Sequence, residues 1–254
     1  MPTSGRRISI YDGVKSPLSG YGPGSIDLVV VRENTEGEYA QAGGFLYHHL
    51  PGEVAVQTSI FTRAGVERIV RHAFELARRR RNHVTSVTKS NAQGFGLVLW
   101  DRVFREVAAE SPDVATDSLL VDAAAMDFVR RPGTFDVVVA SNLFGDILSD
   151  LSAMVTGSIG LAPSANLDPS RKSPSLFEPV HGSAPDIAGK LWSNPMATVL
   201  AAAMMMEHLG EAEIAASMEK AVRDTLAAGD VLTRDLGGQA STAEVAEVLS
   251  TRSV

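Results

Sequence analysis

The sequence predicts an α/β fold, and three observations support this class. Runs of β-branched apolar residues, such as 136–141 and 84–89 and more weakly 53–61, are typical of strands. Between such runs lie longer segments such as 63–81, where apolar residues recur at helical spacing and form one stripe. Polar residues follow the strands directly, which is the usual location of binding residues in α/β folds. The 254 residues suffice for one large domain or two small ones.

Composition and charge exclude several classes of protein. The net charge of -7 argues against nucleic-acid binding, and the basic run 78–81 is expected to end a helix, where cations suit the dipole. There are no cysteines, which rules out disulfides and thiolate metal sites and fits a reducing cytoplasm. No segment is suited to span a membrane, and residues 1–7 lack the apolar core of a signal peptide. We therefore expect a cytoplasmic protein with no nucleic-acid and no membrane partner.

The first strands lead to a polar segment. Residues 8–24 hold a short strand and a Gly/Pro loop, and the apolar run 26–31 predicts a second, buried strand. This strand delivers the segment 32–39, which begins with Arg32 and ends with Tyr39. Such a position favours binding residues, although an isolated charged loop is more often plain surface. Both interpretations stay open from these residues alone.

Two later strands also end in a charged residue. Lys89 closes the β-rich run 84–89, where a lysine is usually paired or snorkelling, but where a buried one could lose its proton and act as a base. Asp122 follows the short strand 118–121 and opens the helix 123–130. Taken singly, Asp122 is explained by the preference of a carboxylate for a helix N-terminus.

The stretch 136–150 is the most informative part of the chain. A buried strand over 136–141 is followed by Asn142, which is expected to cap a helix carrying Asp146 and Asp150 one turn apart on one face. Like charges this close repel each other, and half-burial raises the cost, so the pair suggests a cation between the carboxylates. Carboxylate oxygen is the ligand that Mg2+ and Mn2+ prefer. The alternative for a bare pair is a solvated acidic edge.

The last third of the sequence holds a second unusual segment. Residues 156–174 are rich in Gly, Ser, Pro and Asn, which predicts a functional or mobile loop. In 178–189, small residues would let backbone amides approach a ligand, and Asp186 is the kind of acceptor that binds a ribose diol. The segment is not a G-x-G-x-x-G dinucleotide fingerprint. Helices are expected over 197–209, over 214–228 and after a capping box at 241–244.

Three long motifs together resemble the isocitrate/isopropylmalate dehydrogenase family of β-decarboxylating dehydrogenases. They are Val-Arg-Glu-Asn-Thr-Glu-Gly-Glu-Tyr (31–39), Asn-Leu-Phe-Gly-Asp-Ile-Leu-Ser-Asp (142–150) and Glu-Pro-Val-His-Gly-Ser-Ala-Pro-Asp-Ile-Ala-Gly (178–189). The likeness runs from about residue 6 to the end. Within the family, 156–166 and 204–210 look most like the tartrate/D-malate dehydrogenase branch, with 3-isopropylmalate dehydrogenase as the alternative.

The resemblance implies a role for each matching residue. Tyr39 would be the acid that protonates the enol, Lys89 the base near the reacting hydroxyl, and Arg32, with Arg6, would bind substrate carboxylates. The metal, Mg2+ or Mn2+, would be held by Asp146 and Asp150 together with Asp122 from the partner subunit of a homodimer, so that two chains share each active site. The matching cofactor-binding positions are His181, Gly182, Ser183, Ala184, Asp186, Ile187 and Asn194.

The implied reaction is the oxidative decarboxylation of a 2-hydroxy dicarboxylic acid with NAD. Asp186 would accept from a free 2′-hydroxyl and repel a 2′-phosphate, which favours NAD over NADP. The cation would lower the pKa of the substrate hydroxyl, Lys89 would remove its proton, and hydride would pass to the nicotinamide. Tyr39 would return a proton to carbon after carbon dioxide leaves.

By this resemblance, the sequence is expected to begin inside the family pattern, without its N-terminal part. The expected fold is therefore an isopropylmalate-dehydrogenase-like two-domain fold that is N-terminally truncated. Residues 6–155 would form the dimerisation domain with the substrate and metal residues, and residues 156–254 would form part of the cofactor domain. Two hypotheses follow, an NAD-dependent decarboxylating dehydrogenase or a remnant that folds and dimerises without turnover. For the isolated chain we expect weak or no activity.

Overall fold

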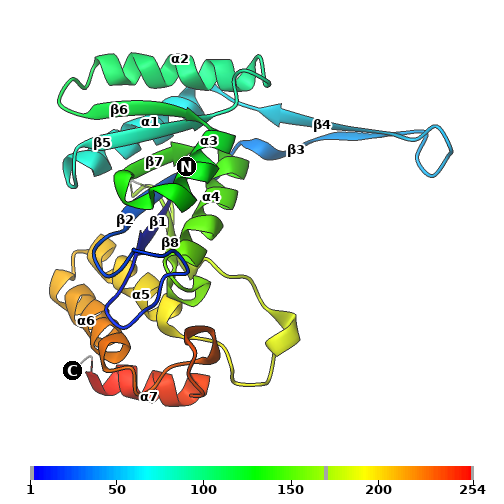
Figure 1. The fold of residues 1–254 in the computed structure, drawn as a ribbon. Helices are drawn as coiled ribbons and strands as arrows, with labels where there is room; N and C mark the ends of the chain where they lie inside the picture. Colours follow the sequence, from blue (N-terminus) through cyan, green and yellow to red (C-terminus); the bar gives the residue numbers. More distant parts are fainter. Residues whose placement is uncertain (1–2, 169–170, 253–254) are drawn as a thin grey trace.

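The computed structural model describes residues 3–168 and 171–252, and it has a mixed α/β architecture (Figure 1). The strands are β1 (Thr3–Ser9), β2 (Asp27–Glu33), β3 (Gly37–Leu46), β4 (Val54–Ile60), β5 (His83–Thr88), β6 (Ala115–Leu120), β7 (Val137–Ala140), β8 (Pro163–Leu167) and β9 (Leu176–Pro179). The α-helices are α1 (Arg63–Arg78), α2 (Gly96–Ala109), α3 (Val121–Arg130), α4 (Asn142–Val155), α5 (Met196–Leu209), α6 (Ala212–Ala228) and α7 (Thr242–Arg252).

Seven strands form one sheet in the order β6-β5-β7-β2-β1-β8-β9. The four strands β6, β5, β7 and β2 run parallel, and β1, β8 and β9 are each antiparallel to their neighbours. The short strand β7 is buried along its whole length, with Val138 in register with Val30 on one side and Thr85 on the other. Such an all-apolar strand is expected at the centre of a sheet whose two faces are covered.

Helices cover the sheet in two groups that match the predicted amphipathic segments. Helix α1 packs against α2, whereas α3 packs against α4, and each pair contacts the parallel strands. The buried stripe of α1 includes Val66, Ile69 and Phe74, as the helical spacing predicts. A second apolar cluster lies among α5, α6 and α7 and includes Leu200, Val222 and Val245. The proposed domain boundary at residue 155 stays a prediction.

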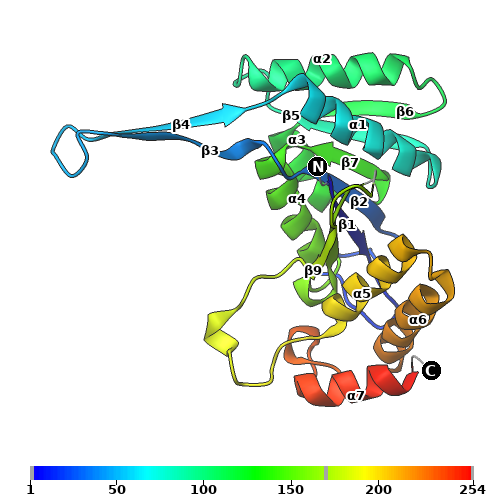
Figure 2. The same ribbon diagram turned by 180° about the vertical axis from the view of Figure 1, so that it is seen from behind.

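A two-stranded arm leaves the body of the molecule (Figures 1 and 2). Among the described strands, β3 and β4 pair with each other and with no other strand, and β4 is exposed along its whole length. The sequence predicts a strand near β4 but not β3, because the Gly, Ala and Gln residues of 37–46 carry little strand propensity. The arm places Tyr39 near its base, within a strand rather than at the end of a loop.

Two local expectations are corrected by the structure. Residues 156–174, expected to be a loop, contain a 3-10 turn at Ile159–Leu161 and strand β8, which pairs with both β1 and β9. Asn142 does not cap α4, because Ser141 is the N-cap residue and Asn142 is already helical. Over the residues that the structure describes, no helix combines the length and hydrophobicity that crossing a membrane requires.

Candidate active site

The carboxyl ends of the parallel strands bring the predicted site residues to one edge of the sheet. Arg32 lies at the end of β2, and α4 begins directly after β7. Lys89 follows β5, and Asp122 lies in the first turn of α3, directly after β6. Since these four strands run parallel, their ends meet at the same edge, which is where open α/β sheets bind ligands.

Two arginines join the two aspartates of α4. Arg6 Nη1 donates to Asp150 Oδ1 at 3.1 Å, and Arg6 Nη2 lies 3.4 Å from Asp146 Oδ1. Arg32 Nη1 also donates to Asp146 Oδ1. We call these four residues the Arg–Asp cluster. Tyr39 reaches it from the arm, because its hydroxyl lies 3.3 Å from Asp146 Oδ2.

Burial shifts the pKa of Arg6 and of Asp150 in the Arg–Asp cluster. Both arginines are 8% exposed. Burial, and then the nearby Arg32, lower the pKa of Arg6. Burial, and then the like charge of Asp146, raise the pKa of Asp150, while Arg6 opposes that rise. Two guanidiniums and two carboxylates thus balance each other in a partly dry environment, where electrostatic interactions are stronger than in water.

Neighbouring side chains orient Arg32 through contacts that the sequence does not predict. Asn142 Oδ1 accepts from Arg32 Nε at 2.9 Å and from Arg32 Nη2 at 2.7 Å. Glu38 accepts from Ser141 Oγ at 2.7 Å and from the amide of Leu143 at 3.1 Å. The carboxylate of Glu38 therefore accepts hydrogen bonds at the N-terminus of α4. The side chain of Asn142 is not needed there and can bind Arg32. Both residues belong to the motifs noted above, but only their contacts reveal these roles.

Helix α4 approaches β2 closely beneath this site. A Cβ added to Gly145 would lie 2.7 Å from Arg32 Cβ and 2.8 Å from Arg32 Cγ. Only glycine fits at this distance without displacing the arginine. The glycine therefore lets Asp146, the next residue, reach the guanidinium of Arg32.

Lys89 and Asp122 form a separate pair. Lys89 Nζ lies 2.5 Å from Asp122 Oδ1, and this hydrogen bond lowers the pKa of the Asp122 carboxyl. Among the described residues, neither side chain hydrogen-bonds to the Arg–Asp cluster. The expected base and the expected third metal ligand thus lie together, apart from the other two aspartates.

The predicted cofactor segment lines a small cavity of about 160 Å³. Four of the predicted residues line it, namely His181, Ala184, Ile187 and Asn194. Gly182, Ser183 and Asp186 belong to the same segment but do not line the cavity. An added Cβ at Gly182 would meet nothing within 4 Å, so the backbone there is open to a ligand.

Asp235 is a further residue of this cavity that the sequence did not suggest. Its Oδ2 accepts from Ser158 Oγ at 2.6 Å and from Asn194 Nδ2 at 3.0 Å, and its Oδ1 accepts from Thr233 Oγ1 at 2.5 Å. These bonds fix the side chain of Asn194. Asp235 lies 41 residues beyond Asn194 in the sequence, so no local pattern links the two residues.

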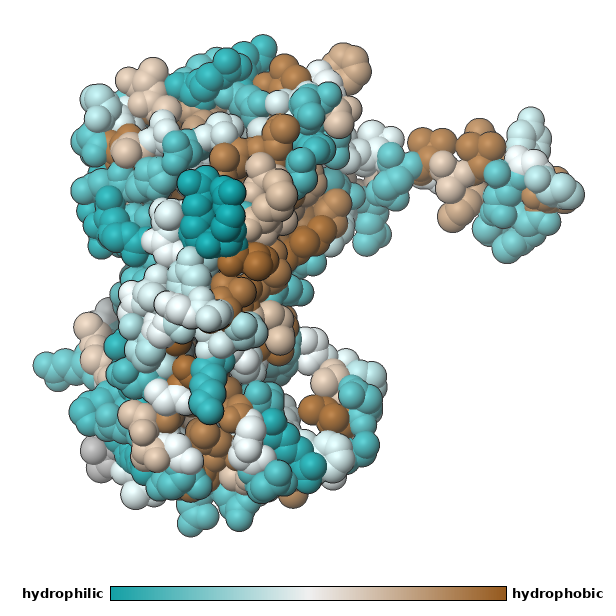
Figure 3. Space-filling view, viewed as in Figure 1, coloured by the Kyte–Doolittle hydropathy of each residue, from teal (hydrophilic) through white to brown (hydrophobic). Residues whose placement is uncertain are grey.

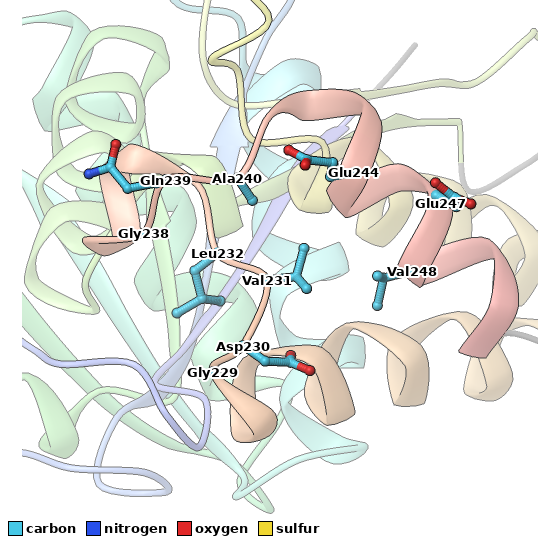
Figure 4. A pocket seen from close by; sticks show the side chains of 10 residues that line it. All are labelled: Gly229, Asp230, Val231, Leu232, Gly238, Gln239, Ala240, Glu244, Glu247 and Val248. Atoms are coloured by element: carbon cyan, nitrogen blue, oxygen red, sulfur yellow. The ribbon is translucent and has the colours of Figure 1, made fainter.

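Cavity size alone does not mark the candidate site. A larger cavity, of about 520 Å³, lies between the loop after α6 and helix α7 (Figure 4). Val231 and Val248 line it from opposite walls, and Glu244 and Glu247 lie at its edge (Figure 4). None of the described residues that line it is a predicted site residue or carries a basic group. We therefore place the chemistry at the sheet edge.

Known proteins share this architecture. A probable tartrate dehydrogenase/decarboxylase of Agrobacterium vitis is 51% identical over 245 residues, which are 96% of this chain and 68% of the relative. A 3-isopropylmalate dehydrogenase of Frankia casuarinae is 56% identical over 223 residues, which are 87% of this chain and 65% of that relative. The crystal structure of isocitrate dehydrogenase from Methylococcus capsulatus superposes with a TM-score of 0.91 and 41% identity, covering 99% of this chain and 73% of that one.

The fold class expected from the sequence is confirmed by these comparisons, and the chain spans about two thirds of the length of its tartrate relatives. A family model described as isocitrate/isopropylmalate dehydrogenase matches residues 6–249. The chain therefore belongs to the isocitrate/isopropylmalate dehydrogenase family.

Proposed function

We propose that the protein catalyses the NAD-linked, divalent-metal-dependent oxidative decarboxylation of a 2-hydroxy dicarboxylic acid of the tartrate or D-malate type. The observation that carries this proposal is the Arg–Asp cluster. Its two buried guanidiniums suit two carboxylates of a small acid, and its two carboxylates suit Mg2+ or Mn2+. When substrate and cation bind together, each charged group exchanges its present partner for a new one, so the charge balance is kept.

The arginines of the Arg–Asp cluster would bind the substrate, and Tyr39 would donate a proton to it. Arg6 and Arg32 would orient the acid by bidentate contacts to its carboxylates. Tyr39 lies beside them, and its phenol is protonated at neutral pH, as is usual for tyrosine; partial desolvation and the charge of Asp146 raise its pKa further. It can therefore donate a proton to carbon. When bound, the cation would polarise the oxygen on C2, and NAD would accept the hydride.

The reaction also needs a base, and we propose that Lys89 supplies it from the partner subunit together with Asp122. The two residues are hydrogen-bonded to each other and not to the Arg–Asp cluster of their own chain. Two exposed apolar residues on α3, Met126 and Val129, and two on α4, Ile147 and Met154, are available for a partner. Figure 3 shows apolar side chains along this face, over α4 and at the base of the arm. A homodimer formed through α3 and α4 would bring the pair of one chain to the cluster of the other.

The relatives favour one type of acid within the class without excluding a second. Proteins named tartrate dehydrogenase/decarboxylase align over 96% of the chain, which favours a substrate of that type. The second candidate is 3-isopropylmalate, because an isopropylmalate relative is 56% identical over a shorter span. The adenosine half of NAD would occupy the cavity beside His181 and Asn194. The expected cytoplasmic location stays a prediction.

The direct test is an absorbance assay for NADH with the purified protein and Mn2+ or Mg2+. D-malate, tartrate and 3-isopropylmalate would be compared with either NAD or NADP. In line with the weak activity expected for the isolated chain, we expect a low rate of metal-dependent NADH production from a tartrate-type acid. This rate should be lost in Tyr39→Phe and kept in the control Tyr21→Phe, whose hydroxyl donates to the carbonyl of Arg130 and to no predicted site residue among those described. Turnover that persists in EDTA, or in Tyr39→Phe, would contradict the proposal. Metal binding without turnover would instead favour the dimerising remnant without catalysis.

A further inference from the structure

We propose that Trp192 forms a wall of the adenine slot and determines the affinity of the protein for adenine nucleotides. This inference rests on the proposed function, because it assumes that the cavity beside His181 receives the adenosine half of NAD. Trp192 lines that cavity together with His181, and it remains 37% exposed. An indole at the mouth of such a cavity offers a flat surface for a base.

The turn that carries Trp192 is fixed at both ends. Thr242 at the start of α7 donates from its amide to Leu191 O at 2.9 Å and from its hydroxyl to Ser193 O at 2.6 Å. Leu191 itself adopts a left-handed conformation, with φ of 55°. The residues on either side of Trp192 are therefore held to a helix, so the indole has a defined position.

Two cations hold the indole ring. The guanidinium carbon of Arg234 lies 4.1 Å from the ring centroid, and Lys190 Nζ lies 4.8 Å from it. Both distances fall within the range of cation–π attraction. Lys190 is exposed, so a base can take its place on the ring. Arg234 belongs to the separate turn Arg234–Leu236 and supports the indole from there.

The chemistry of the cavity suits a purine. Its apolar walls include Ile159, Ala184 and Ile187. The carboxylate of Asp235 is already occupied by three donors, so it adds little polarity of its own. His181 Nε2 is buried and has no hydrogen-bond partner among the described residues. A flat heterocycle with a few polar edge atoms would satisfy this nitrogen and keep the rest of the slot dry.

The two tryptophans of the chain make a direct test possible. Trp100 is fully buried, and its indole donates to Ser86 Oγ at 2.9 Å, so a Trp100→Phe background leaves Trp192 as the sole emitter. We expect 5′-AMP and ADP-ribose to quench its fluorescence in a saturable way. In a chain that keeps Trp100, Trp192→Leu should weaken 5′-AMP binding, measured by calorimetry, about tenfold. Phe95→Leu, at a position that is 93% exposed and does not line the cavity, should leave that affinity unchanged.

The outcomes separate this inference from the proposed function. No quenching, or a Trp192→Leu chain that binds 5′-AMP as tightly as the parent, would overturn the role of Trp192, and so would absence of nucleotide binding by the parent. Unchanged NADH production by Trp192→Leu at low NAD would also overturn it while leaving the dehydrogenase activity intact. Normal quenching in a chain that oxidises none of the three acids would contradict the proposed function. It would still support the role of Trp192 in the adenine slot.

Discussion

The ion pair between Glu33 and Arg68 provides a sharp test of how the end of β2 is held. Glu33 follows Arg32 directly, and its side chain is 1% exposed, whereas that of Arg68 on α1 is 25% exposed. Arg68 Nη2 donates to the two oxygens of Glu33 at 3.0 and 2.8 Å. Thr35 adds a bond from its amide at 2.8 Å and one from its hydroxyl. The carboxylate is thus buried, charged and fully hydrogen-bonded.

Arg68→Met would remove the neutralising charge and keep the apolar part of the side chain. Breaking a buried pair from one side costs about 3–5 kcal/mol, and we expect the lower end, about 3 kcal/mol, because Thr35 still donates to the carboxylate. With a urea m-value of about 2–3 kcal/mol/M, the unfolding midpoint should fall by roughly 1 M. Circular dichroism in urea at fixed protein concentration measures this shift.

A variant on the same helix is the matched control. Arg71 also pairs with glutamates, Glu67 and Glu110, but all three side chains are substantially exposed, so Arg71→Met should leave the midpoint almost unchanged. The double variant Glu33→Gln/Arg68→Met should be more stable than Arg68→Met alone, because no buried charge is left unpaired. Equal midpoints for Arg68→Met and Arg71→Met would refute the reasoning.

Three further predictions concern the site and the core. Gly145→Ala should lower stability by about 1–3 kcal/mol and raise the KM for the acid, because its Cβ would displace Arg32; kinetics and urea unfolding test both effects. Glu38→Gln should lower the unfolding free energy by about 1 kcal/mol through a weaker α4 N-terminus, with the same urea assay as the check. Burial lowers the pKa of His72 in the folded protein. The neutral side chain therefore contributes its full stability above roughly pH 6.5, which is the ordinary pKa of histidine. This contribution is lost as the pH falls through the lower pKa of the folded state. His72→Leu should therefore show a smaller loss of unfolding free energy between about pH 7.5 and 5.5 than the parent, and an equal loss would contradict this.

Much of the fold could be predicted from the sequence because burial leaves a periodic signal. The sequence predicts the apolar strands β2 and β7 and the stripe of α1 within a few residues. It does not predict strands β3 and β8, since their residues have weak strand propensity and pair with segments that no local pattern identifies. Their positions depend on tertiary pairing rather than on local preference.

In the candidate site, too, some features could be predicted from the sequence and others could not. Asp146 and Asp150 could be singled out because helical spacing places them on one face, and both contact Arg6 in the structure. The roles of Glu38 and Asn142 could not be predicted, because each depends on a partner far away along the chain. The sequence does not predict the pairing of Lys89 with Asp122 for the same reason. Spacing identifies residues on one element, but not contacts between elements.

The shared metal site is the central claim, and Mn2+ binding to a purified heterodimer tests it most directly. One chain would carry Asp122→Asn and the other Asp150→Asn, with different affinity tags so that only mixed dimers are recovered. Each single-variant homodimer should bind Mn2+ weakly, because both of its sites lack one carboxylate. The heterodimer should bind Mn2+ tightly at about half the sites of the parent, because one of its two sites is complete. A heterodimer that binds no better than the homodimers, or an Asp122→Asn homodimer that binds like the parent, would contradict a site built from two chains.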